Sequence, residues 1–157
     1  MKTTYIQTPL GITAIEGDEN GVTKITTQTS ADKPNDNHPI ELATACHELK
    51  EYFKGSRTHF TFKLNPEGTN FQKKVWKALL EIPFGTTTSY LELSKKLGDV
   101  KAIRAVAAAN GKNPIWVVIP CHRVIGSDGS LTGYAGGLWR KKWLLEHENP
   151  SPQTSLF

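Results

Sequence analysis

Residues 113–129, NPIWVVIPCHRVIGSDG, decide how the second half of this chain is expected to fold. Residues 114–119 form an almost continuous apolar run rich in β-branched side chains, which predicts a buried strand. Pro120 cannot donate to a sheet ladder, so the strand is expected to end there. Cys121, His122 and Arg123 follow directly. The chain therefore delivers a thiol, an imidazole and a guanidinium at the point where it leaves a core.

The first 65 residues predict a small α/β domain. Strands are expected in YIQT, GITAIE and VTKITT, and the turn between the last two is DENG, whose residue types tolerate positive φ. A polar loop follows, and then a helix from Pro39 whose apolar face comprises Leu42, Cys46, Leu49 and Phe53. The alternation in HFTFKL predicts one more strand. We therefore expect a sheet of three or four strands with one helix.

Helical signals begin after NPEG, residues 65–68, which is the best candidate for a domain boundary. Thr69 followed by Gln72 fits a capping box, and the helix that they open has an apolar stripe of Phe71, Val75 and Leu79. The sequence thus predicts one domain over residues 1–65, a second over 66–149, and a flexible tail over 150–157.

Two short helices joined by a glycine-containing turn are predicted next. Ser89 and Glu92 repeat the capping-box spacing, the helix they open ends near Gly98, and Asp99 can cap the following helix, KAIRAVAAAN. This order is that of a helix-turn-helix. The second helix is almost bare apart from Arg104, so it suits either close packing against another helix or entry into a nucleic-acid groove.

Composition limits the classes of protein that fit. Residues 1–68 carry 7 Lys/Arg and 9 Asp/Glu, a balance of −2, whereas residues 69–157 carry 12 and 6, a balance of +6. This asymmetry indicates either a polyanionic partner or a lysine-rich solvated surface. No apolar run reaches the roughly 20 residues that span a bilayer, and the N-terminus lacks the apolar core of a secretory signal. With two cysteines in 157 residues, we expect a cytoplasmic protein with free thiols.

Cys121 is the candidate nucleophile. We expect it to be half shielded at the end of the strand and poised as a thiolate, with His122 accepting the proton and a carboxylate, Glu146 or Glu148, orienting the imidazole. Because neighbouring residues of an extended chain point opposite ways, the pair needs a turn or a bridging water. Cys46 is interpreted as an inert core residue. The Cys-His spacings do not match structural zinc sites, so no metal is expected.

The segments IPCHRV, FQKKVWKALLEIPFGTTTSY and GYAGGLWRKKWLL resemble the methylated-DNA–protein-cysteine methyltransferases, also called O6-alkylguanine-DNA alkyltransferases. The resemblance covers residues 69–148. It implies a small ribonuclease H-like α/β domain followed by a winged helix-turn-helix-like domain that binds DNA and carries the site. It also implies direct-reversal repair, in which Cys121 takes the alkyl group irreversibly and each molecule acts once. No cofactor is implied.

The resemblance also assigns roles to residues. His122 would act as base through a water, with Glu148 behind it, and Asn113 would brace the active-site turn. The substrate- and DNA-binding residues would be Tyr90, Arg104, Val124, Ser127, Tyr134 and Ala135. Carbonyls near Cys121 and Val124 would accept from the guanine amino group, and Arg104 would fill the gap left by a base flipped from the stack. Some relatives have a serine in place of Ala135, so a hydroxyl contact to the guanine oxygen is impossible here.

The implied partner is double-stranded DNA containing O6-alkylguanine, bound by a monomer through the minor groove; activity on O4-alkylthymine is left open. Two other functions remain open from the residues alone. A non-catalytic module could bind DNA or alkyl lesions through residues 86–112. A cysteine hydrolase could use Cys121 and His122, although it would have little use for Arg104.

Overall fold

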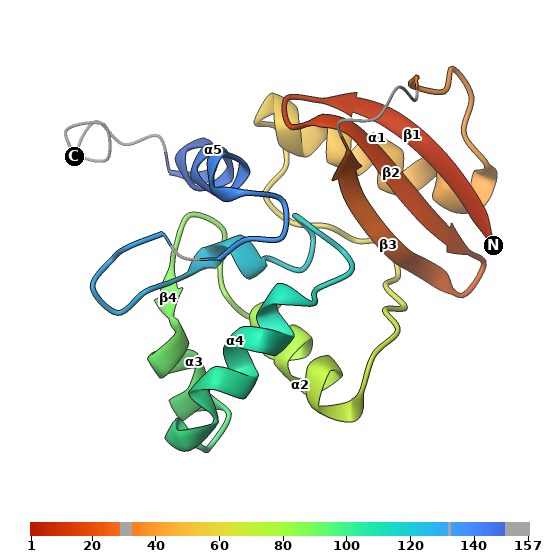
Figure 1. The fold of residues 1–157 in the computed structure, drawn as a ribbon. Coiled ribbons are helices and arrows are strands. Elements are labelled where there is room, and N and C mark those ends of the chain that lie inside the picture. The colour runs from red at the N-terminus through yellow and green to blue at the C-terminus, as the bar shows by residue number, and fades with distance from the viewer. Residues whose placement is uncertain (29–32, 132, 150–157) are drawn as a thin grey trace. The chain divides into compact units, whose positions relative to one another are not determined.

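The computed structural model describes residues 1–28, 33–131 and 133–149. The chain forms two compact units (Figure 1). The first, called here the sheet unit, comprises residues 1–67 and 114–118. The second, the helical unit, comprises residues 68–113 and the described residues from 119 to 149. The predicted tail, residues 150–157, lies outside the described residues.

The sheet unit contains a meander of three antiparallel strands, β1 Lys2–Thr8, β2 Gly11–Asp18 and β3 Gly21–Gln28, in that order. Their ladder pairs Ile6 with Thr13 and Ile15 with Ile25. The turn falls at DENG as predicted, where the Asn20 amide donates to Asp18 Oδ1 at 2.8 Å. Gly21 has φ 130°, a conformation that L side chains rarely adopt.

Helix α1, Ile40–Lys54, lies across one face of this sheet (Figure 1). Leu42, Cys46 and Leu49 are buried as predicted, but Tyr52 takes the buried position expected for Phe53. Burial raises the pKa of the Cys46 thiol to about 11. A buried thiol that stays protonated fits its interpretation as an inert core residue.

The strand predicted in HFTFKL is wrong. Residues 59–64 form only an isolated bridge, in which Leu64 pairs with Val22. A buried carboxylate holds this segment instead, because Glu48 Oε1 accepts from the Thr61 amide at 2.8 Å. This side-chain contact holds the segment in place without a ladder of backbone hydrogen bonds. The sheet therefore has three strands among the described residues.

The strand predicted over residues 114–119 is also wrong. Only Ile115 pairs, with Ile25, and the two flanking backbone bonds join the Ile25 amide to the Pro114 carbonyl and the Trp116 amide to the Ile25 carbonyl. The chain then turns, since the Val118 amide donates to the Trp116 carbonyl at 2.8 Å around Val117, whose φ is 73°. This γ-turn ends the extended conformation. Ile115 and residues 117–119 are nevertheless buried, so the apolar pattern correctly indicated burial but not a strand.

The helical unit begins with α2, Asn70–Leu79, whose capping box at Thr69 and Gln72 is present as predicted. The apolar face of α2 differs from the predicted stripe, since Phe71 is exposed while Val75, Trp76 and Leu79 are buried. Trp76 Nε1 donates to the Ala109 carbonyl at 2.8 Å, which joins α2 to α4, Ile103–Gly111. Figure 1 shows these two helices side by side.

The predicted helix-turn-helix is confirmed. Ser89 caps α3, Tyr90–Lys96, by accepting from the Glu92 amide at 3.0 Å. Asp99 accepts from the Lys101 amide at 2.9 Å and opens a 3₁₀ turn, Val100–Ala102, that leads into α4. Before α3, the two-residue strand β4, Thr88–Ser89, pairs in parallel with β5, Val124–Ile125. This pairing brings the start of α3 to the segment that follows Cys121.

Candidate active site

A tight turn presents Cys121. Pro120, at φ −83° and ψ 61°, lets the Cys121 amide donate back to the Ile119 carbonyl at 2.8 Å, and a 3₁₀ turn, Cys121–Arg123, follows. Asn113 Nδ2 donates to the same Ile119 carbonyl at 2.8 Å. Because the backbone is curled here, Cys121 and His122 are both buried, with 5% and 0% of their surface exposed.

Cys121 differs from its expected state in two ways. It is buried, not half shielded at the end of a strand. Burial also raises its pKa to about 11, against the opposing effects of a hydrogen bond from Asn113 and the charge of Lys141. The expectation of a thiolate at rest is therefore wrong, since a thiol with this pKa is protonated at neutral pH. Its proton must leave as the sulfur reacts, which requires a neighbouring base.

The hydrogen bonds of His122 leave one of its ring nitrogens able to accept a proton. Its Nε2 lies 2.8 Å from Oε2 of Glu148, the last residue of α5, Leu138–Glu148. The Nε2–H tautomer, assigned from this hydrogen bond, leaves a lone pair on Nδ1. Among the residues that the structure describes, Nδ1 has no hydrogen-bond partner. Burial lowers the pKa of His122 despite the neighbouring carboxylate, so the imidazole is neutral near pH 7 and can accept a proton.

The choice between the two glutamates is settled by burial. Glu146 is exposed, and its carboxylate lies 4.0 Å from the ammonium of exposed Lys142. Glu148, by contrast, is buried against His122. Glu148, and not Glu146, is therefore the carboxylate that contacts the imidazole.

Arg123 is a residue to which sequence reasoning gave no role. Its Nε and Nη2 donate to the two oxygens of Glu148 at 2.7 and 2.9 Å, and its Nη1 donates to the Ile82 carbonyl at 2.7 Å. Burial alone would raise the pKa of the Glu148 carboxyl, but hydrogen bonds and charges from His122 and Arg123 lower it to about 2. The hydrogen bond from His122 and the hydrogen bonds and permanent charge of Arg123 together keep Glu148 ionised. The signal was present in the sequence, because an arginine inside a buried segment needs a buried partner.

Lys141 was also missed. In the sequence it is one of several charged residues of LWRKKWLLEHE, yet its side chain has 0% exposure. Its Nζ donates to the Val124 carbonyl at 2.7 Å and lies 5.9 Å from the centre of the Tyr90 ring. Burial lowers its pKa to about 8, and a negative charge on Cys121 would raise it. Lys141 thus places a positive charge where negative charge on sulfur would develop.

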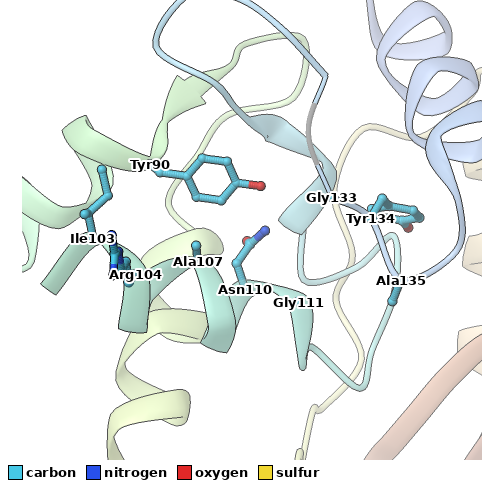
Figure 2. Close-up of a pocket in the computed structure, with 9 residues that line it drawn as sticks. All are labelled: Tyr90, Ile103, Arg104, Ala107, Asn110, Gly111, Gly133, Tyr134 and Ala135. Carbon is cyan, nitrogen blue, oxygen red and sulfur yellow. The ribbon is translucent and has the colours of Figure 1, made fainter.

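The helical unit also contains a pocket of about 670 Å³, whose lining residues Figure 2 shows. Its walls come from the start of α3, one face of α4 and the segment before α5, namely Tyr90, Ile103, Arg104, Ala107, Asn110, Gly111, Gly133, Tyr134 and Ala135. Cys121 adjoins it through Asn110, whose Nδ2 lies 3.5 Å from the Cys121 carbonyl. Burial raises the pKa of the Tyr134 phenol, and a negative charge on Cys121 would raise it further.

The pocket brings together four of the predicted substrate-binding residues and leaves two outside. Tyr90, Arg104, Tyr134 and Ala135 line it. Val124 is buried in β5, and its carbonyl accepts from Lys141 Nζ. Ser127 is exposed and lies outside this set of lining residues. No signal in the sequence distinguished Ser127 from a residue of an exposed turn.

The bare α4 helix has one packed face and one exposed face. Ala109 packs inward, where its carbonyl accepts from Trp76, whereas Arg104, Ala105 and Ala108 are exposed. One face therefore packs closely against another helix, and the other is open to a partner.

Two further observations concern the described residues. Within residues 1–28, 33–131 and 133–149, no helix combines the length and hydropathy needed to cross a bilayer. The same residues contain no cluster of three or more His, Cys, Asp or Glu side chains that could hold a metal ion.

Comparison with known families gives matches over almost the whole chain. Residues 1–66 match the family model described as "6-O-methylguanine DNA methyltransferase, ribonuclease-like domain". Residues 70–150 match "6-O-methylguanine DNA methyltransferase, DNA binding domain".

Individual relatives agree with these models. The methylated-DNA–protein-cysteine methyltransferase of Mycobacterium bovis is 44% identical over 155 residues, which is 96% of this chain and 94% of the relative. That of Methanosarcina barkeri is 57% identical over 104 residues, 66% of each chain. The crystal structure of Mycobacterium tuberculosis O6-methylguanine methyltransferase superposes with a TM-score of 0.84 at 40% identity, covering 99% of this chain and 98% of that one. The chain belongs to the methylated-DNA–protein-cysteine methyltransferase family.

Proposed function

We propose that this enzyme repairs O6-alkylguanine in double-stranded DNA by moving the alkyl group onto Sγ of its own Cys121. A solved structure of Mycobacterium tuberculosis OGT in complex with DNA, 42% identical and with a TM-score of 0.84, supports DNA as the partner; it covers 93% of this chain and 91% of that one. The observation that carries the proposal is the neutral His122, held by Glu148 and Arg123 next to a buried thiol beside a pocket of about 670 Å³.

The step balances as one bond formed and one broken. Sγ of Cys121 forms a bond to the alkyl carbon while the bond from that carbon to O6 breaks, and its electron pair stays with guanine. The thiol proton passes to Nδ1 of His122 through a water, and the departing guanine takes up one proton in exchange. Lys141 stabilises negative charge on sulfur as it develops. The thioether has no route back, so each molecule acts once.

The reacting base reaches this site by leaving the duplex, because its O6 atom is inaccessible to a buried thiol while the base is stacked. The exposed face of α4 is small enough to lie in the minor groove, where Arg104 fills the vacated space. Tyr90 and Tyr134 then wall the extruded base. The protein acts as a monomer, and its two free thiols fit a reducing cytoplasm.

The decisive experiment incubates the protein with a duplex oligonucleotide containing one O6-methylguanine and maps its peptides by mass spectrometry. One methyl group on the Cys121 peptide, at no more than one per molecule, is expected. Cys46→Ala is the matched control and should methylate normally, whereas Cys121→Ala should bind the duplex without removing the methyl group. Repair by Cys121→Ala would contradict the proposal, and so would ester turnover beyond one equivalent by the native protein.

A further inference from the structure

The side chain of Asn110 is the polar group in the pocket that the proposed chemistry does not use. Asn110 stands in the last turn of α4, with 3% of its surface exposed, and it lines the pocket. Its Oδ1 is buried and has no hydrogen-bond partner within the described part of the chain. Figure 2 shows its amide rising from α4 toward the side of the pocket where Tyr90 lies.

The orientation of this amide follows from its neighbour. Nδ2 lies 3.5 Å from the Cys121 carbonyl, so it points toward an acceptor. Rotating the amide by half a turn would set two oxygens against each other. Oδ1 therefore remains directed away from Cys121 as an unsatisfied acceptor. A buried acceptor without a donor costs free energy that an apolar side chain of the same size would avoid.

Two backbone carbonyls are also expected to meet the base, and each of them has a protein donor but keeps acceptor capacity on its oxygen. The Cys121 carbonyl accepts from the Val124 amide and faces Asn110 Nδ2. The Val124 carbonyl accepts from Lys141 Nζ at 2.7 Å. Oδ1 of Asn110 differs from both carbonyls, because it has no donor at all among the described residues and gains most from a donor on the substrate.

The structure of the alkylated base determines which of its groups can donate to Asn110 Oδ1. Alkylation at O6 removes the proton from N1 of guanine, so the 2-amino group is the N–H donor that remains on the base. O4-alkylthymine has lost the proton from N3 and offers no N–H donor at all. We infer that Asn110 Oδ1 accepts a hydrogen bond from the 2-amino group and makes this site select O6-alkylguanine over O4-alkylthymine, an inference that rests on the proposed function.

The test compares duplexes that differ only in the lesion, which is O6-methylguanine, O6-methylhypoxanthine or O4-methylthymine. O6-methylhypoxanthine matters most, because it has the same alkyl group and ring system without the 2-amino group. Single-turnover rates of methyl transfer to Cys121 are measured at saturating protein for the native chain, for Asn110→Leu, which keeps the side-chain volume, and for Asn110→Ala. The native protein should prefer O6-methylguanine over O6-methylhypoxanthine by about 10- to 100-fold, the range expected for a hydrogen bond to a buried acceptor.

Asn110→Leu should bring that ratio close to one, by slowing transfer from O6-methylguanine alone and leaving or raising the rates for the other two lesions. A purely structural role would slow all three equally and leave the ratio unchanged, which would overturn the inference. If Asn110→Leu does not fold, Asn110→Ala supplies the same ratio, and a native protein without preference for the 2-amino group overturns the inference without any variant. Failure of the native protein to methylate Cys121 from any lesion would instead refute the proposed function, and this inference with it.

Discussion

Removing the guanidinium of Arg123 tests whether Glu148, the carboxylate that holds His122, belongs to a buried ion pair. In Arg123→Met, Glu148 loses two hydrogen bonds, at 2.7 and 2.9 Å, and the Ile82 carbonyl loses its donor at 2.7 Å. Glu148 is 5% exposed, so water cannot replace the lost partner. Breaking a buried pair from one side leaves an uncompensated charge and costs about 3–5 kcal/mol of unfolding free energy.

The chain offers a matched control in the ion pair of Lys96 and Glu81. Its nitrogen and oxygen are 3.0 Å apart, but the two side chains are 55% and 62% exposed. Exposed pairs contribute about 0–1 kcal/mol, because water screens them and solvates both partners when they separate. Lys96→Met should therefore cost at least about 2 kcal/mol less than Arg123→Met.

Urea unfolding at neutral pH, followed by tryptophan fluorescence and circular dichroism, measures both free energies. Arg123→Lys should recover only part of the loss, since an ammonium cannot reproduce the two-pronged contact. If Arg123→Met lowers the unfolding free energy no more than Lys96→Met does, Arg123 does not hold Glu148 in a solvent-free site, and the assignment of the brace is wrong.

Four further substitutions test the site and the helices that carry it. The pKa of Glu148 is about 2 in the folded chain against an ordinary 4.5. The contribution of Glu148 to the unfolding free energy should therefore be fully present above pH 4.5 and be lost as the pH falls through 2. In urea titrations, Glu148→Gln should remove about 3 kcal/mol of this pH dependence. His122→Gln should slow methyl transfer by roughly 10²–10⁴ at neutral pH, and its rate should keep rising toward the pKa of Cys121, about 11; a flat pH–rate profile would remove the histidine from the proton path. Thr69→Ala, which breaks the capping box, should cost about 1 kcal/mol in thermal unfolding without changing the transfer rate. Arg104→Ala should slow transfer from duplex DNA far more than from the free O6-methylguanine base, and equal effects on both would contradict its role in base flipping.

Local sequence rules predicted the parts of the structure that depend on residues three or four positions apart. The caps at Thr69, Ser89 and Asp99, the turn at residues 18–21 and the helix pair α3–α4 were confirmed, because each depends on hydrogen bonds within one turn of chain. The Pro-Cys-His motif likewise pointed to Cys121. The apolar run over residues 114–119 correctly predicted burial. It could not predict the path of the backbone, because the same apolar residues can form either a strand or the γ-turn found at Val117.

Only the tertiary structure decided the electrostatics of the site. That Cys121 is a protonated thiol, that Glu148 rather than Glu146 braces His122, and that Lys141 is buried depend on how completely each group is removed from water. Partners set these properties across long separations in sequence, 25 residues from Arg123 to Glu148 and 17 from Lys141 to Val124. The local sequence around a charged residue such as Lys141 does not show whether that residue is buried against a distant partner. Desolvation depends on the packed surroundings and not on the neighbouring residues in the chain.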